Sequence, residues 1–77
     1  MNVVSIGYAL VDFNPKEKEK TFTEDKIRFI SFRKGDIFLV TIRPNRFGWF
    51  EAFRAGDPTN TLGICHQNFA AFYEFLI

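Results

Sequence analysis

The sequence predicts an all-β fold, a small barrel or sandwich of five to six short antiparallel strands. Apolar and β-branched runs are short, and turn residues interrupt them at the intervals typical of an all-β domain. The one charged run that could start a helix is followed by no amphipathic stripe. The chain has 77 residues, of which 18% are aromatic and eleven are phenylalanine. Large aromatic rings can therefore supply much of the buried apolar area that a short chain needs for a core.

The expected strands follow one another along the chain, and turn residues separate them. The strongest extended segment is 37–42, and the others are 7–13, 29–32, 49–54, 62–65 and 69–76. A solvated loop is expected over the mixed-charge run 16–20, which follows an Asn-Pro breaker. Further turns are expected at 33–36, 43–46 and 55–60.

The strand over 37–42 carries apolar side chains on both of its faces. Phe38 and Val40 point to one face and are expected in the core, together with Phe32, Ala52, and Ile64 or its neighbour. Ile37 and Leu39 point to the opposite face, where Phe53 and the tail 72–77 add apolar area. Either the tail folds over this second face, or Ile37, Leu39 and Phe53 contact a protein partner or a second copy.

Composition argues against several classes of protein. Ten Lys and Arg residues stand against nine Asp and Glu residues, and this net charge of +1 argues against a nucleic-acid partner. No apolar run approaches the roughly 20 residues that span a bilayer, so membrane insertion is not expected. Cys65 is the single cysteine, which excludes an internal disulfide and favours a cytoplasmic location. A single domain over residues 1–77 is expected.

The sequence also argues against an enzyme or a metal site. Cys65 and His66 are adjacent, but a structural zinc site needs four nitrogen or sulfur ligands, and the chain holds one Cys and one His. Neighbouring strand residues point to opposite faces, so this pair is not expected to converge as a nucleophile and its base. No phosphate-binding loop, paired-carboxylate site or cofactor fingerprint is present. We therefore expect no catalytic activity, no metal and no cofactor.

Four short segments, taken in order, resemble those of Src-homology 3 (SH3) domains. They are Ala-Leu-Val-Asp-Phe at 9–13, Ile-Ser-Phe-Arg-Lys-Gly-Asp at 30–36, Gly-Trp-Phe-Glu-Ala at 48–52 and Gly-Ile-Cys-His-Gln-Asn-Phe at 63–69. The resemblance covers about residues 8–71 and leaves 72–77 as an apolar extension. It implies an SH3-like barrel, divergent and with a lengthened RT loop. The implied function is binding of proline-rich peptides within a larger signalling or cytoskeletal protein.

The resemblance also implies the binding residues. An aromatic groove would be formed by Val11, Phe13, Trp49, His66, Asn68 and Phe69, with Glu24 and Asp25 of the long loop on its acidic side. Five positions depart from the family pattern, and at two of them, Phe13 and Phe69, phenylalanine replaces a groove tyrosine. Val11 stands where the family has a groove tyrosine, His66 replaces a groove proline, and Phe29 stands where an acid sets specificity. A proline-rich or atypical peptide is therefore the expected partner. The alternative is a structural barrel that docks within its own chain or dimerises, with a vestigial groove.

Overall fold

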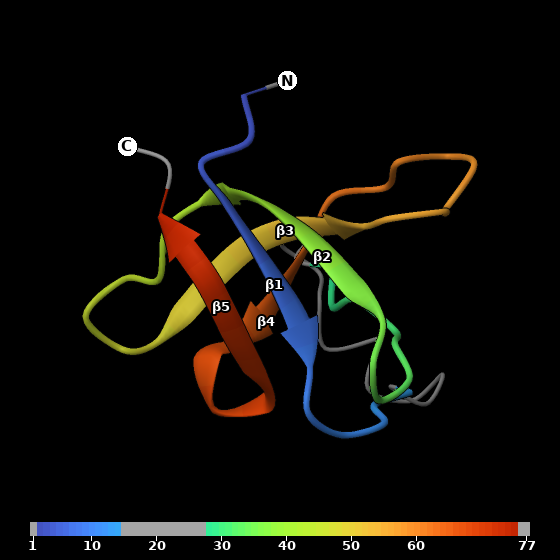
Figure 1. Ribbon diagram of the computed structural model, residues 1–77, viewed down its shortest axis with the longest axis horizontal. Helices are drawn as coiled ribbons and strands as arrows, with labels where there is room; N and C mark the ends of the chain where they lie inside the picture. The colour runs from blue at the N-terminus through green and yellow to red at the C-terminus, as the bar shows by residue number, and fades with distance from the viewer. Residues whose placement is uncertain (1, 15–27, 76–77) are drawn as a thin grey trace.

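The computed structural model describes residues 2–14 and 28–75 and shows an antiparallel sheet that curls on itself (Figure 1). Its order is β4-β3-β2-β1-β5, so neighbours in sequence are mostly neighbours in the sheet. No helix in the described part of the chain is long and apolar enough to cross a membrane. The elements are β1 (Ser5–Ala9), β2 (Ile37–Ile42), β3 (Trp49–Arg54), β4 (Gly63–His66), the 3-10 helix η1 (Gln67–Phe69) and β5 (Ala70–Phe75).

The central strands β2 and β3 have the bounds that the sequence predicts, whereas β1 does not. The strand expected over 7–13 ends at Ala9, and the chain bends at Leu10 and Val11. Beyond the bend Phe13 forms a single bridge with Phe32. The segment 29–32 is likewise limited to isolated bridges. The strand expected over 69–76 is found as β5, which begins one residue later because Phe69 ends η1. The apolar run 7–13 predicts a continuous strand, but the bend at Leu10 and Val11 ends β1 at Ala9.

The core is built largely from phenylalanine rings that meet edge to face. Phe38 is fully buried, and its ring centroid lies 5.1 Å from that of Phe32 and 6.0 Å from that of Phe50. The ring of Phe72 continues this series, edge to face with Phe50 at a centroid distance of 5.1 Å. The expected core residues Phe32, Phe38, Val40 and Ala52 are all buried, and Cys65 rather than Ile64 completes the core on β4.

The C-terminal segment joins the sheet as a strand beside β1. Its register pairs Ala70 with Ala9 and Phe75 with Ser5. Because the ring of Phe72 packs against the core, it does not cover the second face of β2.

The second face of β2 is smaller than the sequence suggested. Phe53 lies opposite Leu39 and is only 8% exposed, so the prediction that Phe53 offers a partner contact is wrong. Ile37 and Leu39 are half-buried, and their role in a second contact stays a prediction.

Candidate functional site

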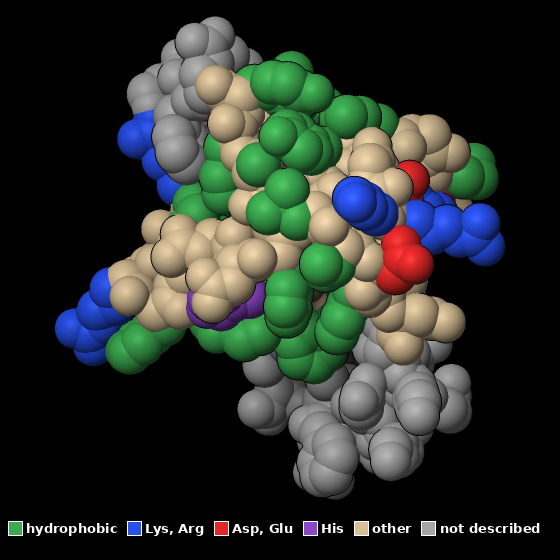
Figure 2. Space-filling model, turned by 60° about the horizontal axis from the view of Figure 1, so that its bottom comes forward, with side chains coloured by type: hydrophobic (Ala, Val, Ile, Leu, Met, Phe, Trp, Pro, Cys, Tyr) green, Lys and Arg blue, Asp and Glu red, His purple; other side chains and the backbone are tan. Residues whose placement is uncertain are grey.

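Five rings form a continuous row on the surface, which we call the aromatic row: Phe13, Phe69, His66, Trp49 and Phe29. Phe13 and Phe69 stack at 5.7 Å with their planes 22° apart, and Phe69 lies 6.4 Å from the His66 ring. His66 meets Trp49 edge to face at 4.9 Å, and Trp49 lies 6.0 Å from Phe29. Figure 2 shows the histidine (purple) with hydrophobic side chains (green) gathered beside it.

Different elements supply the members of the row, which the fold brings to one surface. Trp49 begins β3 and His66 ends β4, and these two residues are paired across the sheet. Phe69 lies in η1, directly after β4. Phe13 follows the bend after β1, where its bridge to Phe32 fixes the backbone. Phe13 and Phe69 pack against the core, so the rings at this end of the row are anchored from below.

His66 is held by hydrogen bonds to both of its ring nitrogens. Its Nδ1 accepts from the backbone N–H of Asn68 at 3.1 Å. Its Nε2 lies 2.8 Å from the carbonyl oxygen of Phe47. Since Nδ1 accepts, Nε2 carries the proton and donates to this carbonyl. The imidazole therefore connects the turn before β3 to the 3-10 turn after β4, and it supports the edge of Trp49.

The turn before β3 leaves space for the imidazole by having a glycine at position 48. Gly48 has φ +91°, and a Cβ built on it would lie 2.6 Å from Nε2 of His66. Its carbonyl accepts the N–H of Gln67 at 2.7 Å, which adds a second link to η1. In the same turn the side-chain oxygen of Asn45 accepts the N–H of Trp49 at 3.0 Å. These contacts fix the backbone from which Trp49 projects.

The structure brings together four of the eight residues predicted for the groove: Phe13, Trp49, His66 and Phe69. Asn68 is exposed in η1 and holds His66 through its backbone. Val11 lies in the bend after β1 and is 42% exposed. Glu24 and Asp25 lie outside the described residues. Two contacts were not expected from the sequence, the ring of Phe29 beside Trp49 and the carbonyl of Phe47 on His66.

Comparison with solved structures assigns the architecture. The chain is similar to the SH3 domain of yeast NBP2, with a TM-score of 0.64 over 91% of this chain and 98% of that chain. The chain has an SH3-like fold. The two sequences are 18% identical, so the likeness is one of fold. The sequence of this SH3-like domain matches no protein-family model and no curated protein sequence.

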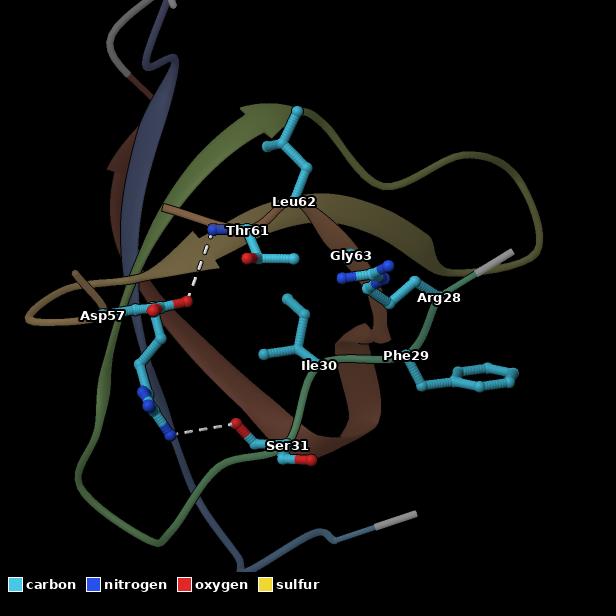
Figure 3. Close-up of a pocket in the computed structure, with 9 residues that line it drawn as sticks. Arg28, Phe29, Ile30, Ser31, Asp57, Thr61, Leu62 and Gly63 are labelled. Atoms are coloured by element: carbon cyan, nitrogen blue, oxygen red, sulfur yellow. Dashed lines mark hydrogen bonds between the residues drawn. The ribbon is translucent and has the colours of Figure 1, made fainter. Parts of the chain in front are cut away.

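Residues next to Phe29 line a hollow in the surface of the SH3-like domain, which we call the arginine pocket. Its volume is about 130 Å³, and residues 28–31, Arg54, Asp57 and residues 61–63 line it. Figure 3 shows the side chain of Arg28 extending toward Gly63, whereas the ring of Phe29 points away from the hollow. Arg54 donates to the carbonyl of Ser31 at 3.4 Å. Phe29 therefore separates the arginine pocket from Trp49.

Cys65 and His66 face different surroundings in the SH3-like domain. The Cys65 side chain is buried in the core cluster, and this burial raises the pKa of its thiol to about 12. The imidazole of His66 lies in the aromatic row instead. The two side chains do not converge on one reacting atom. Among the described residues, no group of three His, Cys, Asp or Glu side chains could hold a metal ion.

Because the thiol of Cys65 is buried, we expect the domain to lose stability at alkaline pH. The unfolded chain releases the Cys65 proton near the ordinary pKa of 9.0, whereas the folded chain retains it up to about 12. Above pH 9 the unfolded state binds fewer protons, so the unfolding free energy falls as pH rises between these values. Urea unfolding at about pH 8 and about pH 10.5 should show a drop that is up to about 2 kcal/mol larger in the parent than in Cys65→Ala. Equal drops in the two proteins would contradict this role of the thiol.

Proposed function

We propose that this SH3-like domain is a non-catalytic interaction module that binds a short proline-rich or related peptide along the aromatic row. The observation that carries the proposal is the position of Trp49, which is 38% exposed between His66 and Phe29. Tryptophan is strongly enriched among the residues that dominate binding energy. The proposed setting is a cytoplasmic signalling or cytoskeletal protein.

The geometry of the row suits a polyproline ligand. Such a peptide is already extended before it binds, so little conformational entropy is lost on docking against aromatic faces. The stacked pair of Phe13 and Phe69 offers an apolar surface at one end, and Trp49 offers a larger one further along. Neither phenylalanine carries a hydroxyl, so hydrogen bonds that tyrosines would give, each contributing about 0.5–1.5 kcal/mol, are lacking. Apolar contact therefore supplies most of the affinity that we propose.

The proposal predicts that Trp49→Ala abolishes peptide binding. Loss of a central hot spot costs about 2 kcal/mol or more, which corresponds to at least a roughly 30-fold weaker Kd. An array of proline-rich peptides identifies ligands for the parent, and fluorescence polarisation then compares the variants. Because Trp49 is the single tryptophan of the chain, its fluorescence gives a second titration of the parent.

Two controls make this test specific. Ile42→Ala removes an exposed apolar side chain at the end of β2, outside the aromatic row, and should leave binding unchanged. Circular dichroism and a urea titration should show that Trp49→Ala keeps the fold, because the indole is exposed. The assignment is wrong if Trp49→Ala unfolds, or if it binds the array peptides as the parent does.

The acidic side of the groove stays a prediction. Glu24 and Asp25 would take a basic residue of the ligand and so set its orientation. They lie outside the described residues, and exposed ion pairs contribute only about 0–1 kcal/mol.

A further inference from the structure

We propose that the Trp49 end of the aromatic row selects peptides in which an acidic side chain flanks the residue that packs on Trp49. This inference rests on the function proposed above and specifies the chemistry of the peptide. Arg28 directly precedes Phe29, whose ring contacts Trp49, and Arg46 lies in the turn that leads to Trp49. The described carboxylates are engaged by the chain itself.

Arg46 lies in the turn before β3, the strand that Trp49 begins. Its guanidinium carbon is 4.9 Å from the centroid of the Phe47 ring. The carbonyl of Phe47 accepts the Nε2 proton of His66, whose ring contacts Trp49. Stacking on a ring uses the flat face of a guanidinium and leaves its N–H edge directed outward, where a carboxylate can accept two hydrogen bonds.

Arg28 directly precedes Phe29, whose ring contacts Trp49. Its backbone is fixed because its carbonyl accepts the N–H of Ile64 at 2.8 Å. Its side chain lines the arginine pocket together with Arg54 (Figure 3). A peptide that packs an apolar side chain over the touching rings of Trp49 and Phe29 would therefore have Arg28, next to Phe29, and Arg46, next to Phe47, as the nearby arginines in the chain.

The carboxylates of the described side chains are occupied in holding turns and strands. Asp12 accepts the N–H of Lys34 at 2.7 Å, and Asp36 accepts that of Arg33 at 2.9 Å. In the arginine pocket itself, Asp57 accepts both the N–H and the hydroxyl of Thr59, at 3.0 and 2.8 Å. Glu51 on β3 accepts the hydroxyl of Thr41 at 2.8 Å. These hydrogen bonds fix the carboxylates without neutralising them. In the lining of the arginine pocket two guanidinium groups, Arg28 and Arg54, stand against the one carboxylate of Asp57, so the balance of charge there is positive.

A set of three labelled peptides tests this selection. Each has the core Phe-Pro-Pro-Leu-Pro-Pro, flanked at both ends by two Glu, two Gln or two Lys residues. Flanking both ends makes the comparison independent of the direction in which the peptide binds. Exposed ion pairs are weak, so fluorescence polarisation should show the Glu peptide binding roughly 3–10-fold more tightly than the Lys peptide at about 25 mM salt. The ratio should shrink at about 250 mM salt.

Charge reversal assigns the selection to particular residues. Arg28→Glu and Arg46→Glu should each lower the Glu-to-Lys preference, and the double variant should invert it. Arg33→Glu is the matched control, because it makes the same charge change at an exposed residue in the turn before β2 and should leave the preference nearly unchanged. Urea unfolding verifies that each variant folds.

The outcomes separate this inference from the proposed function. If Arg28→Glu and Arg46→Glu leave the Glu-to-Lys preference as it is in the parent, charge selection by Arg28 and Arg46 is overturned, and peptide binding stands. The change between parent and variant decides, because Glu24 and Asp25 would bind the Lys peptide equally in both. If the Arg33→Glu control lowers the preference as much as Arg28→Glu does, net charge acts rather than these positions, and the inference also fails. If none of the three peptides binds and the proline-rich array gives no ligand, the proposed function itself is overturned.

Discussion

Phe38→Ala is expected to lower the unfolding free energy by about 3–5 kcal/mol, the usual cost of truncating a buried phenylalanine. A domain of 77 residues has a total stability of about 4–12 kcal/mol, so much of the variant should be unfolded or close to unfolding. The cause is the position of the ring, which is fully buried and meets both Phe32 and Phe50 edge to face in the core. Removal leaves a cavity that these two rings cannot both fill.

Urea unfolding followed by Trp49 fluorescence measures the effect, and Phe47→Ala is the matched control. Phe47 is 66% exposed at the tip of the turn before β3, so the same truncation there should change stability by less than about 0.5 kcal/mol. Similar losses in the two variants would contradict the placement of Phe38 at the centre of the core.

Gly48→Ala adds one methyl group at the aromatic row and is expected to lower the unfolding free energy by about 2–4 kcal/mol. The left-handed φ of +91° alone disfavours alanine by about 1–2 kcal/mol. The new Cβ would also lie 2.6 Å from Nε2 of His66, which forces the imidazole away from the carbonyl of Phe47 and the N–H of Asn68. Each lost hydrogen bond costs about 1 kcal/mol.

The chain offers a matched control for the glycine. Gly56 has φ +88° and no atom within 4 Å of the position that a Cβ would take, so Gly56→Ala should cost only the backbone part. In the Gly48→Ala variant, His66→Ala should remove the clash. His66→Ala should therefore lower the unfolding free energy less in that variant than in the parent. Equal costs for Gly48→Ala and Gly56→Ala in urea unfolding would show that the imidazole does not occupy the space over Gly48.

Local sequence patterns predicted the strands that lie in the middle of the sheet. In β2, Phe38 and Val40 alternate with half-buried neighbours, and the turns on either side are marked by Gly35 and Pro44, so both bounds are visible in the sequence. The end of β1 is not visible in the same way. The chain remains apolar through Leu10 and Val11, yet it bends there.

The candidate site was partly predictable for the same reason. Trp49, His66 and Phe69 lie within or beside recognisable segments, and the curled sheet brings them together. The place of Phe29 beside Trp49 depends on a parallel bridge between Phe29 and Ile64, which are far apart in sequence. The burial of Phe53 also depends on tertiary packing that alternation along one strand does not reveal. Local sequence patterns therefore could not predict these long-range contacts.

The pairing of β1 with β5 also determines how the domain responds to a pulling force. The first residue of β1 and the last residue of β5, Ser5 and Phe75, lie opposite each other at one end of the barrel (Figure 1). Bonds between antiparallel strands run perpendicular to them. A force that separates Ser5 from Phe75 therefore acts along the hydrogen bonds between β1 and β5 and breaks them one after another, starting at this end. Tension carried through both ends would open this sheet edge first, while η1 and its ring Phe69 lie at the opposite end of β5.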